Sequence, residues 1–539
     1  MKPYKINNIA GHLAKIFLAN PLTPILAFAI IALGYLSLEV MPREEDPQIE
    51  VSGGSIMVAI PGATPKEIEN VIIKPLERRI REIKGVENVY GMAANNAGML
   101  NVQYHIGQNR ELSNLKLYDK VMQHMDKLPK GTMPPLVKPF DIDIDIPILT
   151  VAFYKSGEST TDNIKLYQTI REIQQDINAL DNVSKTVLKG VMKPQFNVLI
   201  DLQKLSAYHI SLGQVAKAIR SISTNAPEID ATSSTGKLTV FGIKNAIDDI
   251  DDLKNLIVAQ YMGAPIYLKS LAKIEYSYDI QNFQSVFFAY QDLNSSSATP
   301  KFIEAGKQVT LTVSKLKGTN AVKIAERAIE ELAKNSEVLQ AHGVKYSITR
   351  NYGDRANEAV NELVHHLEIT IIIIAAILIP FLGWRESLVV TIAVPMILAL
   401  TLFIAYMSDQ TINRITLFAF LLSLGLIVDD AIIVIENIHR RMHLPESQGL
   451  SFSQIIVEAT DEIGPSTNIA TIAIILTMIP MAFVGGMMGQ FMTPIPLNVP
   501  VALAISLFVA YVFAPYLAKK FLKYEKPKKE NIPSKEKQV

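Results

Sequence analysis

The sequence predicts an α-helical membrane bundle of six transmembrane helices, with a large α+β domain of βαβ-type lobes between helices one and two. Hydrophobic residues make up 49% of the 539 residues, and the mean hydropathy is +0.21, a composition unlike that of soluble enzymes. The apolar residues form one segment near the start and a dense block after about residue 364. A long polar middle separates them, so membrane and water-exposed parts can be assigned separately.

Charge and cysteine content exclude several classes of protein. The formal net charge is zero, so the chain has no basic footprint for a nucleic-acid partner. Because it contains no cysteine, it can form neither disulfides nor thiolate metal sites. It also contains no phosphate-binding loop, zinc motif or credible Ser-His-Asp arrangement. We therefore expect no cofactor and no enzymatic activity, with energy supplied by an ion gradient.

The first helix is expected at residues 22–41, after a basic amino-terminal tail at residues 1–21. The tail carries Lys2, Lys5 and Lys15 and no acid, which resembles the front of a signal peptide. The apolar segment ends without a clean small-x-small cleavage site. We therefore expect a signal anchor that stays in the membrane, with a cleaved signal peptide as the alternative.

Five further apolar stretches are expected to span the membrane. Some are shorter than the ~20 residues that a spanning helix needs, but the short connections between them favour spanning hairpins. Several prolines lie inside them, which a packed bundle tolerates better than a water-exposed helix. The predicted helices are residues 364–384, 387–407, 414–437, 464–484 and 496–518.

The positions of basic residues predict the orientation. Arg385, the connection at residues 438–463 with Arg440 and Arg441, and the lysine-rich tail at residues 519–539 share the side of the basic amino terminus. By the positive-inside rule this side is cytoplasmic. We therefore expect a multi-pass protein of the bacterial inner membrane, with residues 42–363 forming a large periplasmic domain.

The first lobe of that domain is expected at about residues 50–140. An alternating run at residues 56–60 predicts a strand, and Thr64-Pro65 with Glu67 is a capping-box start for a helix. A strand-like stretch at residues 86–106 and a helix at 112–128 complete a βαβ-type unit.

The same order of elements recurs in a second lobe, at about residues 145–188 and 275–354. It is interrupted by an insertion at about residues 189–274, which has strands and a helix of its own and so forms a separate small domain. The second lobe comprises strand 148–154, helix 162–180, a strand from 183, helix 321–339 and strand 344–349, and the insertion comprises strands 195–201, 238–242 and 265–268 and helix 212–222.

The candidate functional residues are two successive acids, Asp429 and Asp430, inside the apolar fourth helix. An ionised Asp near the bilayer centre costs about 2.5 to 3.5 kcal/mol on insertion scales, so such acids are functional by default and should face the bundle interior or a water path. Low dielectric and the neighbouring like charge both disfavour ionisation, which suits a proton carrier near neutral pH. The alternative, permanent pairing with basic side chains, would need a partner from outside the chain, because the apolar part of each predicted helix, residues 415–435 in the fourth, contains no Lys or Arg.

The segment GLIVDDAIIVIEN at residues 425–437 resembles the fourth-helix motif of RND efflux transporters of the hydrophobe/amphiphile, acriflavine-resistance (AcrB-like) type. MPREEDP at 41–47, PGATP at 61–65, IPMAF at 479–483 and the order of one helix, a large domain and five helices are also similar. The resemblance implies a proton/drug antiporter with Asp429 and Asp430 as its proton relay, porter lobes, and a docking-like insertion. In the family's heavy-metal exporters the second acid is commonly not Asp, so Asp430 favours export of hydrophobic or amphiphilic compounds.

The resemblance covers an amino-terminal half only, since the usual transporter carries two such halves. The missing half would supply the lysine and arginine that pair with the acids and one wall of the drug pocket. We therefore expect a separately encoded carboxy-terminal half or a second copy of this chain. The family also implies a periplasmic adaptor (membrane fusion protein), an outer-membrane channel and a trimer-like assembly.

Other interpretations stay open at this stage. A heavy-metal exporter subunit, a protein-export accessory of the SecD type and a non-transporting remnant are the alternatives, although the SecD motif lacks the adjacent Asp pair. His365-His366 could bind a metal or sense pH, with interfacial polarity as the plainer interpretation. A soft-metal site is also conceivable at the methionines Met478, Met481, Met487, Met488 and Met492.

Overall fold

The computed structural model describes residues 6–49, 51–140, 145–155, 160–222, 229–232, 238–241, 249–279, 286–291, 302–447 and 449–524. Lys2, Lys5, the tail beyond residue 524 and Gly242, the predicted end of a strand, lie outside these ranges. Six helical segments are long and apolar enough to cross a membrane, as expected. They are α2 (Thr23–Val40), α14 (Tyr352–Leu382), α15 (Trp384–Met407), α16 (Arg414–His443), α17 (Phe452–Met478) with η4 (Ile479–Phe483), and α18 (Gly486–Met492) with α19 (Pro494–Phe521).

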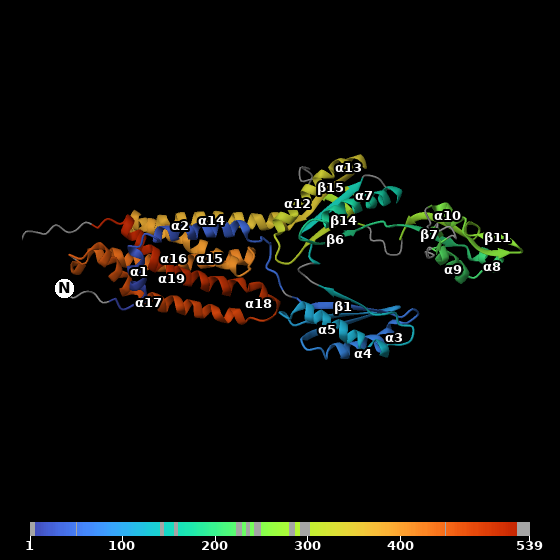
Figure 1. The fold of residues 1–539 in the computed structure, drawn as a ribbon, viewed down its shortest axis with the longest axis horizontal. Helices are drawn as coiled ribbons and strands as arrows, with labels where there is room; N and C mark the ends of the chain where they lie inside the picture. The colour runs from blue at the N-terminus through green and yellow to red at the C-terminus, as the bar shows by residue number, and fades with distance from the viewer. Residues whose placement is uncertain are drawn as a thin grey trace, which may run out of the picture.

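The six segments pack into one bundle, and the sheets lie beyond one end of it (Figure 1). Helix α1 (Ile9–Leu18) and the last turn of α19 lie at the end away from the sheets, which we call the terminal end; the opposite end is the domain end. Helices α16 and α19 are the most buried, and their inward residues form much of the apolar core of the bundle.

Several predicted bounds were wrong because amphipathic turns continue the helices beyond their apolar stretches. Helix α14 has 31 residues and begins at Tyr352, where the Asn351 side chain caps it directly after the last strand. The connection predicted at 438–463 is mostly helical, since α16 continues to His443 and α17 begins at Phe452. The tail predicted at 1–21 contains α1, which packs against α17 and α19.

The first lobe is a four-stranded sheet of order β2-β3-β1-β4 in which every neighbouring pair is antiparallel. The single strand predicted at 86–106 is therefore wrong. It is a hairpin, because Asn96, with φ of +66°, turns the chain between β2 and β3. The lobe comprises β1 (Gly53–Ala59), α3 (Pro65–Ile68), η1 (Glu69–Ile73), α4 (Lys74–Ile80), β2 (Val86–Ala94), β3 (Ala97–Tyr104), α5 (Arg110–Met122), η2 (Met125–Lys127) and β4 (Leu136–Phe140).

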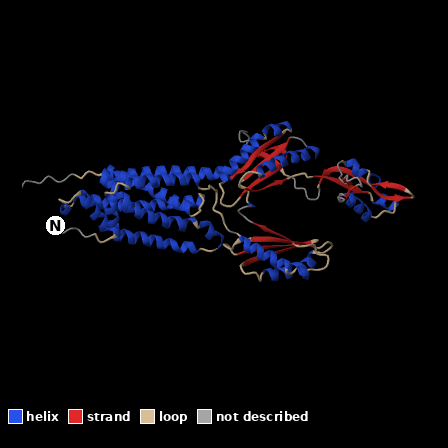
Figure 2. Ribbon diagram, viewed as in Figure 1, coloured by secondary structure: helices blue, strands red, loops and turns tan. Residues whose placement is uncertain are grey.

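The second lobe is a five-stranded sheet in which β14 pairs with β13, β5 and β6, and β5 pairs with β15. Its central strand β14, 14 residues long, was not predicted from the sequence. The lobe comprises β5 (Leu149–Lys155), α7 (Thr160–Asn178), β6 (Val183–Lys189), β13 (Phe287–Gln291), β14 (Phe302–Lys315), α12 (Ala321–Lys334), α13 (Ser336–Ala341) and β15 (Val344–Asn351). In both lobes the strands lie on the side toward the other lobe and the helices lie outside (Figure 2).

The insertion extends beyond the second lobe, away from the bundle (Figure 1). It contains antiparallel pairs β7–β12, β10–β11 and β8–β9, and β7, β10, β11 and β12 contribute to a small apolar core. Its elements are β7 (Pro194–Ile200), α8 (Leu202–Ala207), α9 (Leu212–Ile222), β8 (Ile229–Thr232), β9 (Leu238–Phe241), α10 (Ile250–Lys254), β10 (Ile257–Tyr261), β11 (Ala264–Tyr267), α11 (Leu268–Leu271) and β12 (Ala272–Tyr278).

A short linker, residues 42–48, joins α2 to the first lobe and is fixed to both bundle and second lobe. The Glu44 amide donates to the Ile412 carbonyl (2.9 Å), and the Ile412 amide donates to the Pro42 carbonyl (2.9 Å). The Glu44 carboxylate pairs with Lys315 at the end of β14 (2.8 Å), and these side chains are only 3% and 8% exposed. The linker therefore connects the start of α16 to the second lobe.

Candidate functional site

The predicted acids lie near the middle of α16 and point in different directions. Asp430 is 5% exposed and faces α17 and α19, whereas Asp429 is exposed on the outer surface of this chain. Successive residues of an α-helix point about 100° apart, so adjacent acids cannot share one face of a packed helix. The expectation that the pair faces inward holds in this chain for Asp430 alone.

Two hydroxyl groups contact the Asp430 carboxylate, one from each neighbouring helix. Thr471 Oγ1 of α17 donates to Oδ1 (3.1 Å), and Ser506 Oγ of α19 donates to Oδ2. Both residues are buried, Thr471 at 3% and Ser506 at 0% exposure. The sequence analysis missed both; Ser506 is the one Ser or Thr of α19, whereas Thr471 is one of several hydroxyl residues in α17.

Each hydroxyl also has a backbone carbonyl within reach. Thr471 Oγ1 lies 3.0 Å from the Thr467 carbonyl, and Ser506 Oγ lies 2.8 Å from the Leu503 carbonyl. A hydroxyl has one hydrogen and two acceptor lone pairs. It can donate to an ionised Asp430, or it can donate to the carbonyl and accept the proton of a neutral Asp430. The site therefore satisfies hydrogen bonding in both protonation states.

Small residues on α19 allow this close approach. Ala502, Ser506, Ala510 and Ala514 recur every four residues, and all four are fully buried. Small side chains in one stripe let membrane helices pack closely. The carboxylate on α16 can thus reach the backbone ridge of α19.

No basic side chain forms an ion pair with Asp429 or Asp430 within the described ranges. Asp429 lies on an exposed stripe of α16 with apolar neighbours three to four residues apart, at Phe418, Leu422, Gly425 and Ile433. An added Cβ at Gly425 would meet nothing within 4 Å. A carboxylate on an apolar membrane surface is costly unless another group covers it.

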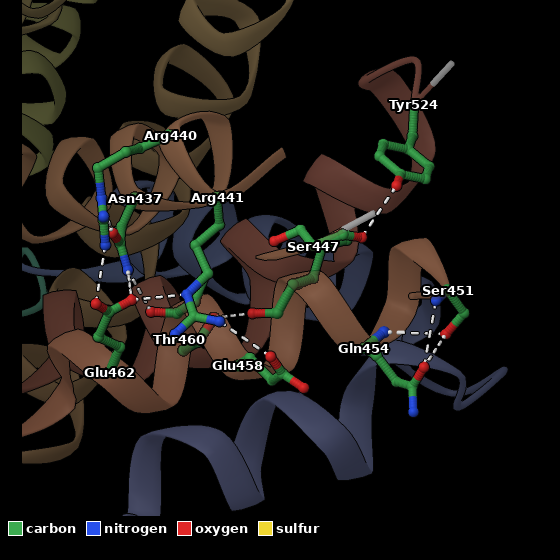
Figure 3. Close-up of polar contacts among 12 residues, drawn as sticks. Asn437, Arg440, Arg441, Ser447, Ser451, Gln454, Glu458, Thr460, Glu462 and Tyr524 are labelled. Atoms are coloured by element: carbon green, nitrogen blue, oxygen red, sulfur yellow. Dashed lines mark hydrogen bonds and ion pairs between the residues drawn. The ribbon is translucent and has the colours of Figure 1, made fainter. Parts of the chain in front are cut away.

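A second polar cluster closes the terminal end of the bundle (Figure 3). Asn437, which is buried, donates from Nδ2 to the Ala459 carbonyl (2.7 Å) and to Glu462 (3.2 Å). Arg441 pairs with Glu458 (2.9 Å) and with Glu462 (2.8 Å), so α16 and α17 are joined at their ends. Glu436, next to Asn437 in the chain, is exposed at this end.

The other candidate residues do not gather into a site. His365 and His366 are exposed on α14 with ring centroids 6.4 Å apart. Groups of three or more His, Cys, Asp or Glu able to hold a metal are absent from the described residues. Met487 and Met488 point outward on α18, at 51% and 64% exposure.

A model of the AcrB/AcrD/AcrF family matches residues 13–537 of the chain, across the bundle and the lobes. This is a family of RND transporters, in accord with the motif at residues 425–437. The match covers nearly the whole chain and does not mark it as one half of a longer protein, so the half-size expectation stays a proposal.

Proposed function

The chain belongs to the AcrB/AcrD/AcrF family of RND transporters, and from this and the acid site we propose that it is a subunit of a proton-driven pump exporting hydrophobic or amphiphilic compounds. Asp429 and Asp430 carry the protons in this proposal. The observation that supports it best is the Asp430 site, in which two hydroxyls with alternative acceptors suit both protonation states. A permanent cationic partner would instead hold the acid ionised.

The orientation that we propose places the terminal end in the cytoplasm and the lobes in the periplasm of a bacterial inner membrane. Arg440, Arg441, Lys519 and Lys520 lie at the terminal end, in keeping with the positive-inside rule. A proton crossing from the domain end to the terminal end gains about 2.3 kcal/mol per 100 mV of membrane potential. This energy is comparable with the cost of charging a buried acid, so protonation can shift helix packing.

The exposed Asp429 supports a partner within the membrane. We propose that a separately encoded carboxy-terminal half, or a second copy of the chain, covers the stripe around Asp429 and supplies a basic side chain that pairs with Asp429 while it is ionised. Such a partner would also complete the substrate pocket. A periplasmic adaptor and an outer-membrane channel, with which this family generally works, would complete the pump in a trimer-like assembly.

Dye efflux from cells that lack their own major pumps tests the proposal. The chain is expressed alone, with the candidate second half, and with that half plus Asp430→Asn, which keeps the size of the side chain and removes its charge and proton. We expect efflux only with the second half, and its loss in Asp430→Asn at equal expression. Asp409→Asn, on an exposed loop, is the matched control and should retain efflux. Efflux that survives Asp430→Asn would show that Asp430 carries no transported proton.

A further inference from the structure

Helix α17 buries a polar face in the membrane. Few of its residues within the apolar stretch are buried, and these are Asp461, Gly464, Thr467 and Thr471. The spacing of three to four residues places them in one line, about 15 Å long from the terminal end to the Asp430 site. Buried polar groups are costly in a membrane unless they are hydrogen-bonded or used.

The groups that face this line come from α19. The Tyr511 hydroxyl, 3% exposed, donates to Asn468 Oδ1 (2.9 Å) and lies 3.4 Å from the Gly464 carbonyl. Tyr511 therefore contacts α17 between Thr471, which binds Asp430, and Asp461 at the terminal end.

Asp461 ends the line under helix α1. Its carboxylate, 1% exposed, accepts the amides of Asn7 (3.1 Å) and Asn8 (2.9 Å), at the start of α1. An added Cβ at Gly464 would lie 2.8 Å from Ala10, and one at Gly11 would lie 2.5 Å from Asp461 Oδ1. Helix α1 thus packs directly over the terminal end of the line.

We propose that this α17–α19 seam, made of Asp461, Gly464, Thr467, Asn468, Thr471 and Tyr511, is the proton route between Asp430 and the terminal side of the membrane. The inference rests on the proposed function, because it assumes that Asp430 exchanges a proton. Hydroxyl, amide and carbonyl groups in the seam supply the two to four partners that each conducting water needs. Tyr511 is the positioning residue at its midpoint: it orients a water and keeps its own proton. The titratable groups nearest Asp430 from the packed helices are Asp429 and Tyr511.

The buried hydroxyl groups of α16 between Asp430 and the domain end are widely spaced. Between Asp430 and the domain end, the buried face of α16 carries hydroxyls only at Ser423 and Thr416, seven residues apart. Seven helical residues rise about 10 Å, too far for one hydrogen bond. On the terminal side the buried face of α17 carries Thr467, four residues from Thr471, then the Gly464 carbonyl and Asp461. The Tyr511 hydroxyl of α19 lies beside this face, 3.4 Å from the Gly464 carbonyl, so polar groups of two helices contribute to the seam.

Infrared spectroscopy of the full chain in lipid nanodiscs tests the inference. The carboxylic C=O band that Asp430→Asn removes is followed on acidification, and its shift after transfer to D2O gives the rate of proton exchange. Tyr511→Phe keeps the ring and removes the hydroxyl, and Thr467→Val keeps the shape of the side chain. We expect each to slow exchange about tenfold, which is about 1.4 kcal/mol of barrier. Tyr516→Phe, the same change five residues along α19 and half-buried, should exchange like the unmodified chain.

The outcomes separate the two proposals. If the Asp430 band is present and exchanges equally fast in Tyr511→Phe and Thr467→Val, the seam is a packing feature and the inference is wrong, while the proposed function stands. If Asp430→Asn removes no band at any pH, Asp430 is never protonated, and both proposals are wrong. A purely structural role for Tyr511 would lower stability without slowing exchange, so thermal unfolding is measured beside it.

Discussion

Replacing Lys315 with methionine should open the linker that connects the bundle to the second lobe. The Lys315 and Glu44 side chains are 8% and 3% exposed and 2.8 Å apart, so the change removes one partner of a buried ion pair. Gln48 Nε2 donates to the same carboxylate (2.8 Å) but carries no charge. Removing one partner of a buried ion pair costs about 3 to 5 kcal/mol. At about 1.4 kcal/mol per tenfold change, protection of the linker should fall roughly a hundred- to several-thousand-fold.

Hydrogen exchange of peptides that cover residues 42–48 measures this effect directly. The double variant Glu44→Gln with Lys315→Met has no unpaired charge and should recover most of the protection, since replacing a buried pair by neutral groups is often nearly neutral. Lys345→Met, on the exposed side of β15, is the matched control and should leave the linker unchanged. Equal exchange in Lys315→Met and the unmodified chain would refute the reasoning, as would a double variant no better protected than the single one.

Two further predictions concern the same connection and the helix packing. Burial, with the neighbouring Asp46, raises the pKa of Glu45 above its ordinary 4.5, against the lowering effect of Arg414. The stability that this raised pKa contributes is present below about pH 4.5 and is lost as the pH rises through the raised value. Glu45→Gln should therefore raise the thermal midpoint of unfolding at neutral pH. A gain in midpoint that persists at pH 3 would contradict this reasoning. An added Cβ at Gly34 would lie 2.4 Å from Ala399 Cα, so Gly34→Ala should cost about 1 to 3 kcal/mol of stability through overpacking and lower the thermal midpoint. Gly425→Ala, where an added Cβ meets nothing within 4 Å in this chain, is the control and should leave the midpoint unchanged. Equal midpoints in the two variants would argue against close packing of α2 on α15.

The sequence predicted the six apolar helices because each is a long apolar stretch, a property that residues carry locally. It missed how far the helices continue. The first turns of α14 and α17 are polar on one side, and their helical state depends on caps at Asn351 and Ser451 and on packing against other elements. It also missed β14, whose pairing with β5 and β6, both more than 100 residues earlier in the chain, carries no local signal.

The acids themselves could be found from the sequence, since two charges in an apolar helix are conspicuous wherever they occur. Which of the two is buried could not, because it depends on which face of α16 meets α19. Thr471 and Ser506 lie 41 and 76 residues from Asp430 and look like ordinary polar residues of membrane helices. The contacts of Tyr511 and Asp461 depend on the packing of α17 against α19 and α1, so neither residue could be identified from the sequence.

The same contacts indicate how a proton at Asp430 could affect the lobes. Helix α16 begins at Arg414, whose amide donates to the Glu45 carbonyl (3.1 Å) and whose guanidinium pairs with Asp46 (2.5 Å). Asp430 is 16 residues further along this helix, about 24 Å by helical rise. A helix of this length transmits a shift with little bending, because its backbone hydrogen bonds would otherwise break. Protonation of Asp430 changes the hydrogen bonds between its carboxyl group and the hydroxyls of Thr471 and Ser506. An axial movement of α16 that follows this change would pull on the linker. The linker in turn holds β14 through Glu44 and Lys315, so the second lobe is the part of the outer domain most directly connected to the proton site.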